Sequence, residues 1–253
     1  MKVRGKTALV TGGCGGIGLA TAAVFLDARL DVVLVDRETS RGEDIAARHP
    51  GRVRLVAVDL ADADALVATL GPIFTGDGAP DVLVNNVGVS PKYHPDGERL
   101  KAWTITVGQW DDLFATNVRS YFLCTKLALP AMMARGYGRI VNIASYAARA
   151  GAYQAAPHYV ASKAAILGLT KAVAKEVTPH GVTVNAINPG RIATQMTRDV
   201  AEAVNTAIID QIPARRLGQP DDIAKVALFL ASDLADYLTG TAIEVNGGLY
   251  MGP

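Results

Sequence analysis

The amino-acid sequence predicts an α/β protein built on a doubly wound parallel sheet of about seven strands, with helices on both faces. Short apolar runs of strand length alternate with helix-length amphipathic stretches from one end of the chain to the other, which is typical of successive βαβ units. A glycine-rich segment directly follows the first apolar run, where such proteins turn from strand to helix. The 253 residues, half of them apolar, are enough for one complete core.

The strands are expected, in order and with helices between them, at residues 7–11, 31–35, 53–58, 82–85, 139–143, 183–187 and 242–245. Most of these runs are continuously apolar rather than alternating, as expected for parallel strands that are covered on both faces. No internal repeat, low-complexity tract or linker divides the chain. We therefore expect residues 1–253 to form a single domain.

Composition excludes several classes of partner and compartment. The formal charge of +1 gives no clustered basic surface for nucleic acid or an anionic membrane. No run of eighteen apolar residues and no signal peptide is found in the sequence, so we expect no membrane association. Cys14 and Cys124 are too few for a disulfide framework, which indicates a reducing, cytoplasmic location.

The turn after the first predicted strand carries a dinucleotide-binding signal of the Rossmann-like type. Gly12, Gly16 and Gly18 form a G-x-x-x-G-x-G pattern, which differs by one residue from the commonest fingerprint. Glycines there let the backbone approach a pyrophosphate, and the amides of the following helix attract its charge. The turn expected to hold the cofactor comprises Gly12, Cys14, Gly15, Gly16, Ile17 and Gly18.

The residues at the end of the second predicted strand indicate which of NAD and NADP is bound. Asp36 stands at that end, where a carboxylate can accept both ribose hydroxyls and repels a 2′-phosphate. Arg37, the next residue, could instead pair with a 2′-phosphate. We expect NAD, with NADP possible, because Gly15 leaves the turn without a basic side chain. A P-loop is excluded, since no Gly-Lys-Ser/Thr closes the glycine run.

One segment interrupts the regular alternation and is expected to shape a pocket. Residues 90–106 combine prolines, a glycine and mixed charges without a clear period, which predicts a long loop at the carboxyl end of a strand. Lys92, Tyr93, Arg149 and Gln154 lie in loops near this end, where they either contact an anionic substrate or are simply solvated.

A hydroxyl, a phenol and an amine are predicted to converge at the end of the strand at residues 139–143. Ser145 follows this strand, and Tyr159 and Lys163 stand four residues apart, on one face of a helix. An ammonium beside a phenol favours the phenolate, which predicts a lowered pKa for Tyr159. Taken alone, the pair could equally be an aromatic ring packed on a lysine stem.

Metal binding is not expected. The four histidines show no paired metal spacing. His158 borders Tyr159 along the chain, but neighbours in a helix face different ways, so a structural role is favoured.

Together these motifs resemble the short-chain dehydrogenase/reductase family over essentially the whole chain, in its single-domain NAD(P)-dependent form similar to 3-oxoacyl-ACP reductases. The shared motifs are Thr11-Gly-x-x-x-Gly-Ile-Gly18, Asp59-Leu60, Asn85-Asn-Val-Gly88, Asn117, Ser145, Tyr159-x-x-x-Lys163, Pro189-Gly190 with Thr194, and Arg216-Leu-Gly-Gln-Pro-Asp-Asp-Ile-Ala224.

The resemblance implies a role for each matching residue. Tyr159 would be the general acid/base, Lys163 would hold the nicotinamide ribose, Ser145 would bind the substrate oxygen, and Asn117 would hold a proton-relaying water. Around the cofactor it implies Asp59 and Leu60 at the adenine, Asn86 and Gly88 along the cleft, and Pro189, Gly190, Ile192 and Thr194 at the nicotinamide. The family also implies a mobile substrate lid near residues 193–213 and a homotetramer or homodimer.

The predicted activity is hydride transfer between a nicotinamide cofactor and a secondary alcohol or ketone. Steroids, sugars, acyl thioesters, dihydrodiols and hydroxy acids all remain possible substrates. In the lid, Met196, Val200, Ile208 and Ile209 suggest a partly apolar pocket. The alternative is a non-catalytic NAD(H)-binding regulator, which the presence of Ser145, Tyr159 and Lys163 disfavours.

Overall fold

The computed structural model describes residues 2–76, 78–152, 155–194 and 202–252 of the chain. Its centre is a seven-stranded, all-parallel sheet with strand order β3-β2-β1-β4-β5-β6-β7. The strands are β1 Thr7–Thr11, β2 Asp31–Asp36, β3 Val53–Ala57, β4 Val82–Asn85, β5 Gly138–Ile143, β6 Val182–Pro189 and β7 Ala242–Val245. All seven predicted strands are confirmed, and only β6 is noticeably longer than expected.

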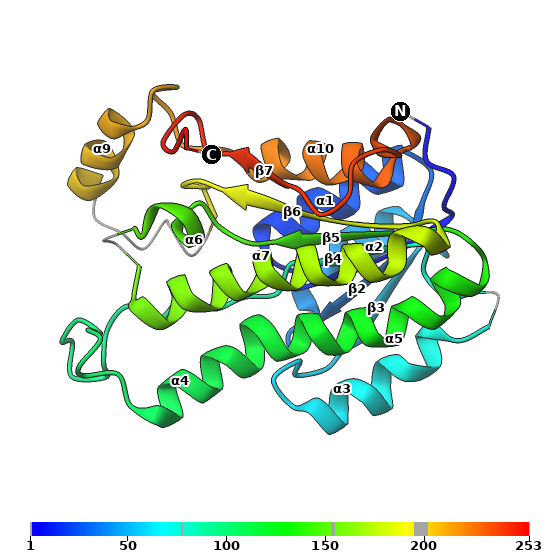
Figure 1. Ribbon diagram of the computed structural model, residues 1–253, viewed down its shortest axis with the longest axis horizontal. Helices are drawn as coiled ribbons and strands as arrows, with labels where there is room; N and C mark the ends of the chain where they lie inside the picture. The colour runs from blue at the N-terminus through cyan, green and yellow to red at the C-terminus, as the bar shows by residue number, and fades with distance from the viewer. Residues whose placement is uncertain (1, 77, 153–154, 195–201, 253) are drawn as a thin grey trace.

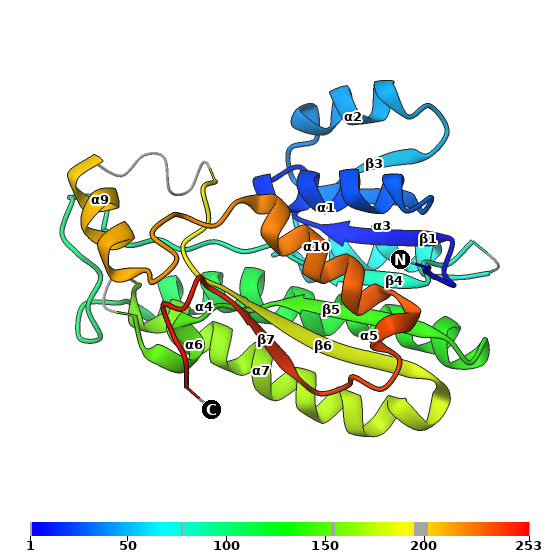
Figure 2. The ribbon, with the colours of Figure 1, turned by 90° about the horizontal axis from the view of Figure 1, so that it is seen from above.

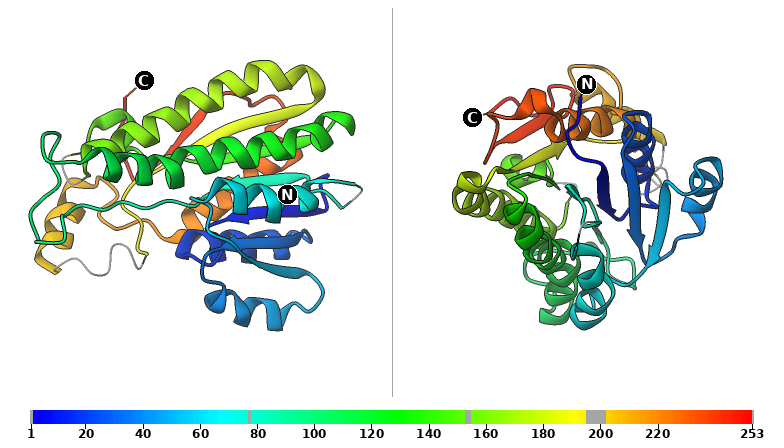
Figure 3. Two further views of the ribbon diagram at one scale, coloured as in Figure 1. Left: turned by 90° about the horizontal axis from the view of Figure 1, so that it is seen from below. Right: turned by 90° about the vertical axis from the view of Figure 1, so that its right-hand side faces the viewer.

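Helices cover both faces of the sheet (Figure 1 and Figure 3). Helices α1 Gly16–Asp27, α2 Glu43–Arg48 and α10 Pro220–Ala231 lie on one face. The other face carries α3 Ala63–Leu70, α4 Val107–Phe114, α5 Ser120–Ala134 and α7 Pro157–Val177. Two short helices, α6 Ala147–Ala150 and α9 Glu202–Gln211, lie beyond the ends of the strands.

The alternation of side chains along each strand divides the core into two layers. In β1, Ala8 and Val10 pack with α1 and α10, where Phe25 and Leu230 are buried. Leu9, between them, packs on the opposite face with α3 and α5. Figure 2 shows α1 and α10 side by side over the sheet. Continuous apolar strands thus supply both layers, which is why they do not alternate in sequence.

The strand order places a crevice where the chain reverses its direction of winding. β1 pairs with β2 on one side and with β4 on the other, and the segments that follow β1 and β4 leave the sheet at the same edge. In Figure 1 the strand arrows point toward α6, α9 and the loop before α4. Ligands of open α/β sheets bind at such a switch point, so the fold brings the predicted site residues to one edge.

Candidate active site

The glycine turn packs tightly against its neighbours. Gly12 has a φ of 60°, and a Cβ there would lie 2.8 Å from Cα of Val87, in the segment after β4. A Cβ at Gly18 would lie 2.3 Å from the carbonyl oxygen of Gly12, so this glycine allows α1 to pack on the turn. Helix α1 begins at Gly16, and its amino terminus opens into a cavity lined by Gly15, Gly16 and Ile17.

Asp36 is fixed by two backbone amides at the end of β2. Cys14 N–H donates to its Oδ2 over 3.0 Å, and Arg37 N–H donates to its Oδ1 over 2.8 Å. The thiol of Cys14 is buried behind the turn, where burial and the nearby Asp36 raise its pKa to about 11. Cys14 was predicted to bind the cofactor, but its side chain does not line the cavity. Its backbone amide instead holds the carboxylate of Asp36 in place.

Arg41 is a residue that the sequence reasoning missed. It lines the same end of the cavity as Asp36 and Arg37. The sequence reasoning looked for a ribose-binding carboxylate only at the end of β2. Arg41 lies five residues further on, in the short 3₁₀ turn Ser40–Gly42, and this turn brings it to the same end of the cavity. A second basic residue within a few positions of Asp36 was the available signal.

The segments after β3 and β4 form the middle of the cavity. Asp59 and Leu60 line it, and Oδ1 of Asp59 accepts the amide of Ala61 over 2.9 Å. Asn86 donates from Nδ2 to the carbonyl oxygens of Thr11 and Gly12 over 3.0 and 2.9 Å. These two bonds hold the segment after β4 against the glycine turn across the switch point.

Asn117 lies in a single π-helical turn, Ala115–Arg119, between α4 and α5. Its side chain is buried and brackets Val89, with Nδ2 donating to the carbonyl over 3.0 Å and Oδ1 accepting the amide over 2.9 Å. It does not line the main cavity. A Cβ at Gly88 would lie 3.4 Å from Lys163 Nζ and 3.6 Å from Asn117 Oδ1, so glycine leaves a gap beside both.

Ser145, Tyr159 and Lys163 converge as predicted. Ser145 follows β5, and the other two residues project from the first two turns of α7. Ser145 and Tyr159 line the same cavity, and Oγ of Ser145 accepts the backbone N–H of Ala147 over 3.1 Å. Lys163 Nζ donates to the carbonyl oxygen of Ile143 over 2.9 Å and to the hydroxyl of Tyr121 over 3.4 Å. Tyr121, which the sequence reasoning missed, lies one helical turn after Asn117.

The expected direct effect of Lys163 on Tyr159 is wrong for this arrangement. Burial raises the pKa of Tyr159, although the Ser145 hydrogen bond opposes it, and burial lowers the pKa of Lys163 to about 7. The amine lies 6.0 Å from the Tyr159 ring centroid and contacts Ile143 and Tyr121 instead. Desolvation is therefore the largest influence on the pKa of each group.

The end of the cavity near Tyr159 is closed by the end of β6 and the segment after it. Pro189, Gly190, Ile192 and Thr194 line the cavity, and a Cβ at Gly16 would lie 3.1 Å from Thr194 Cγ2. The expected lid continues beyond this point: Met196 and Val200 lie outside the described residues. In α9, Ile208 is buried and Ile209 is half-buried.

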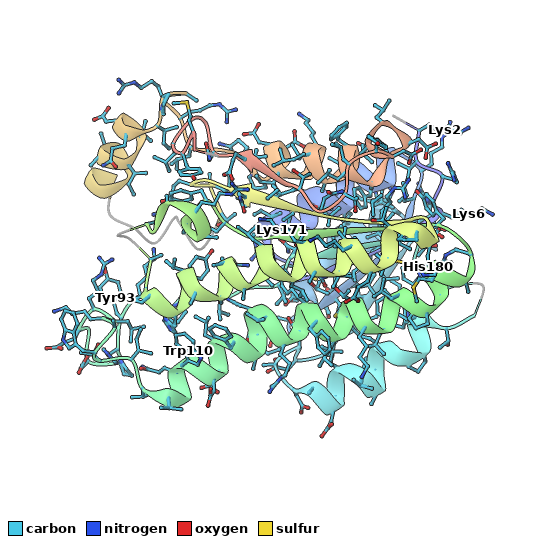
Figure 4. All side chains as sticks on the ribbon, in the orientation of Figure 1. Lys2, Lys6, Tyr93, Trp110, Lys171 and His180 are labelled. Atoms are coloured by element: carbon cyan, nitrogen blue, oxygen red, sulfur yellow. The ribbon has the colours of Figure 1, made fainter. Side chains whose placement is uncertain are left out.

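The predicted substrate loop at residues 90–106 contains a small hairpin. Tyr93 and Arg99 form an antiparallel bridge, and Leu100 N–H donates to the carbonyl oxygen of Lys92 over 2.9 Å. Tyr93 points outward at the end of the molecule that the strand arrows face (Figure 4). Arg149 pairs with Glu244 over 3.1 Å, and Gln154 lies outside the described residues.

A single cavity of about 690 Å³ joins the two ends of the site. The predicted residues that line it are Gly12, Gly15, Gly16, Ile17, Asp36, Arg37, Asp59, Leu60, Asn86, Gly88, Ser145, Tyr159, Lys163, Pro189, Gly190, Ile192 and Thr194. Cys14, Gly18 and Asn117 lie behind its wall. The helix terminus, the strand-end carboxylate and the glycine-bordered gap beside Lys163 fit an extended dinucleotide.

Three further findings concern metals, membranes and the burial of His158. Among the described residues, no group of three or more His, Cys, Asp or Glu side chains could hold a metal ion. Within the same residues, no helix is long and apolar enough to cross a membrane. His158 is fully buried, beside Tyr159 in sequence.

The chain is similar to known proteins over almost its whole length. A family model described as Enoyl-(Acyl carrier protein) reductase matches residues 12–250. The chain is 36% identical over 252 residues to a 3-oxoacyl-[acyl-carrier-protein] reductase FabG of Vibrio cholerae, covering 99% of this chain and 100% of the relative. It is 38% identical over 257 residues to the FabG of Pseudomonas aeruginosa, covering 99% and 100%.

Solved structures include relatives with either cofactor. A 3-oxoacyl-[acyl-carrier protein] reductase with bound NAD from Brucella melitensis superposes with a TM-score of 0.88 at 35% identity, covering 98% of this chain and 92% of the other. A putative NAD(P) dependent gluconate 5-dehydrogenase with bound NADP from Beutenbergia cavernae gives 0.90 at 34% identity, covering 98% of each. From its fold, its site and these relatives, the chain belongs to the short-chain dehydrogenase/reductase family of NAD(P)-dependent oxidoreductases.

Proposed function

We propose that this protein interconverts a secondary alcohol and a ketone, with Tyr159 as the general acid/base. The observation that carries the proposal is the single cavity that runs from Asp36, past the glycine turn, to Ser145, Tyr159 and Lys163. A dinucleotide bound at one end would extend toward the phenol of Tyr159 and the hydroxyl of Ser145, which line the other end. The comparisons give no support to the alternative of a non-catalytic regulator.

The proposed chemistry needs a proton and a hydride to leave the same alcohol. A bound nicotinamide supplies the hydride acceptor. In its phenolate form Tyr159 takes the hydroxyl proton, and Ser145 donates a hydrogen bond to the substrate oxygen as its charge changes. The reverse steps, with the proton returned from Tyr159, reduce a ketone.

Lys163 and Asn117 are proposed to hold the proton path and the cofactor. With a pKa of about 7, the amine of Lys163 can gain or lose a proton near neutral pH. It borders the gap at Gly88 that Asn117 also borders, which supports the proposed water between them. Lys163 is further proposed to bind the ribose of the nicotinamide.

NAD is the proposed cofactor. Asp36 supports it, because its carboxylate is held in place by the Cys14 amide and lines the cavity where an adenosine ribose would lie. NADP is the second candidate, favoured by Arg37 and Arg41 at the same end. The relatives with bound NAD and with bound NADP are consistent with either.

Assembly and location follow from the family. We propose a homotetramer, or else a homodimer, in the cytoplasm. The exposed side chains of Trp110 on α4 (Figure 4) and Phe122 on α5 support a covered surface there. A native mass equal to that of one chain, measured by light scattering, would contradict the proposed assembly.

The proposed role of Tyr159 is tested by Tyr159→Phe. We expect kcat to fall by about 10²–10⁴-fold, because proton transfer to a positioned side chain contributes that much. Cofactor affinity should be unchanged, measured by isothermal titration calorimetry. Tyr93→Phe, on the exposed hairpin, is the matched control and should retain full turnover. A Tyr159→Phe enzyme within about tenfold of the native rate would remove Tyr159 from the mechanism.

A further inference from the structure

The hydroxyl of Tyr121 lies where three elements meet behind the wall of the main cavity. Tyr121 projects from the first turn of α5 and is fully buried. Its oxygen lies 3.0 Å from the carbonyl oxygen of Val87, after β4, and 3.0 Å from that of Ile143, at the end of β5. It also lies 3.4 Å from Nζ of Lys163 on α7. One hydroxyl therefore connects α5 to two strand ends and to the amine of the proposed catalytic cluster.

The amine of Lys163 has few other groups to hold it. Within the residues that the structure describes, its hydrogen-bond partners are the hydroxyl of Tyr121 and the carbonyl oxygen of Ile143, the latter at 2.9 Å. The titratable groups beside this pair are Tyr159, one turn earlier on α7, and Cys124, three residues after Tyr121. Burial raises the pKa of Tyr159 and, to about 12, that of Cys124, so neither gives the amine a negative charge near neutral pH in the protein without cofactor. The position of the amine is therefore set by one carbonyl and one hydroxyl.

A hydroxyl can reverse the direction of its hydrogen bond, whereas a carbonyl can only accept. The Tyr121 hydroxyl has one proton to donate and lone pairs that accept. When Lys163 is an ammonium, it donates to the Tyr121 oxygen, and the hydroxyl proton points to the carbonyl oxygen of Val87 or Ile143. When Lys163 is a neutral amine, its lone pair can accept the Tyr121 proton while one of its own N–H groups still reaches Ile143. Tyr121 can therefore bind the amine in both protonation states.

We infer that Tyr121 is a positioning residue of the proton path, whose hydroxyl holds Nζ of Lys163 in one place as the amine gains and loses a proton. The inference rests on the proposed function and adds a residue to it. Tyr121 does not line the main cavity, and burial raises its pKa well above the ordinary value, so it keeps its own proton and acts only through Lys163. Without this hydroxyl, the amine would have one partner at the end of a flexible four-carbon stem.

A purely structural role for the hydroxyl gives a different expectation. The ring of Tyr121 packs in a cluster with Ala144, Ile166 and Ala186, and the hydroxyl also satisfies the carbonyl of Val87. Phenylalanine keeps this packing and removes the hydrogen bonds. A structural role predicts a loss of stability alone, whereas the inferred role also predicts a change in the titration of Lys163 and in turnover.

The experiment measures the titration of Lys163 by NMR of isotope-labelled lysine in the cofactor-free protein, and kcat as a function of pH. In Tyr121→Phe we expect the Lys163 midpoint to fall by about one pH unit, because a hydrogen bond to an ammonium is stronger than one to a neutral amine. We expect kcat at neutral pH to fall by about tenfold, which is the worth of one hydrogen bond. Tyr137→Phe is the matched control, since it removes a buried hydroxyl, bonded to the Gly5 amide over 3.3 Å, at the opposite edge of the sheet. It should change neither quantity.

Replacement of Tyr121 by para-aminophenylalanine provides a rescue, because its amino group keeps a donor at the same position. This protein should regain the native Lys163 midpoint and most of the lost turnover. A native midpoint or native turnover in Tyr121→Phe would overturn the inference, as would changes of equal size in Tyr137→Phe or a failure of the rescue. Each of these results leaves the proposed function standing, whereas no turnover of any alcohol or ketone by the native protein overturns both.

Discussion

At the scale of single residues, burial decides the charge states of the site. Lys163 is only 3% exposed, and its amine is held by one carbonyl and one phenol, neither of which carries a negative charge. A buried amine without a counter-ion favours its neutral form. The four-residue spacing of Tyr159 and Lys163 predicted their convergence but not this effect, because sequence spacing carries no information about desolvation.

The lowered pKa of Lys163 makes stability depend on pH. The folded pKa, about 7, lies below the model value of 10.5, so the unfolded chain binds more protons between these values. Stability is therefore reduced below pH 7 and rises as the pH increases toward 10.5. At about 1.4 kcal/mol per pKa unit, this rise is on the order of 5 kcal/mol.

Urea unfolding without cofactor at pH 7 and pH 9.5 measures this rise. In Lys163→Met the contribution should disappear, so that the pH dependence of the unfolding free energy becomes flatter than in the native protein. Lys101→Met, which removes an exposed lysine, should keep the native slope. Identical slopes in the native protein and Lys163→Met would show that Lys163 titrates normally in the folded state.

At the scale of elements, irregular turns position the functional groups. The π-helical turn at Ala115–Arg119 directs Asn117 inward, where its amide clamps Val89 and so shapes the loop after β4. The hairpin at residues 92–100 gives the expected long loop a defined form, anchored by Leu100. Neither feature has a local sequence pattern, since both depend on contacts between segments far apart in the chain.

The close packing of α1 on the glycine turn predicts the effect of Gly18→Ala. The added Cβ would lie 2.3 Å from the carbonyl oxygen of Gly12, so the turn or the helix must shift. We expect the free energy of unfolding to fall by about 1–3 kcal/mol, and cofactor affinity to fall with it because the turn faces the pyrophosphate.

Gly168→Ala is the matched control for this substitution. Gly168 lies exposed in α7 with open space around its Cα, so alanine should stabilise the protein by about 0.5–1 kcal/mol. Thermal unfolding and calorimetric titration with NAD measure both effects. Unchanged cofactor affinity in Gly18→Ala would contradict the proposed position of the pyrophosphate.

At the scale of the whole molecule, one cavity spans the sheet edge from the end of β2 to the end of β6. Asp36 at one end and Tyr159 at the other are brought together only by the order of the strands. The end of the cavity proposed to hold the adenosine contains one carboxylate from β2 and two arginines, and we expect their balance to set the cofactor preference.

We expect kcat/KM with NAD(H) to exceed that with NADP(H) by at least about tenfold, because Asp36 would repel a 2′-phosphate. Arg41→Ala should leave the NAD(H) value nearly unchanged and lower the NADP(H) value further. Arg48→Ala, an exposed arginine on α2, serves as the matched control. An NADP(H) value that equals or exceeds the NAD(H) value would overturn the proposed preference.

The sequence by itself determined the parallel sheet, its strands and the glycine turn, and it predicted that Ser145, Tyr159 and Lys163 lie together. These are local properties, because hydrophobic periodicity and glycine placement are written in consecutive residues. Only the tertiary structure decided that Cys14 turns away from the cavity, that Arg41 joins Asp36, and that Lys163 is too buried to act as a charged partner of Tyr159. Those outcomes depend on burial and on the approach of distant segments, which no short stretch of sequence encodes.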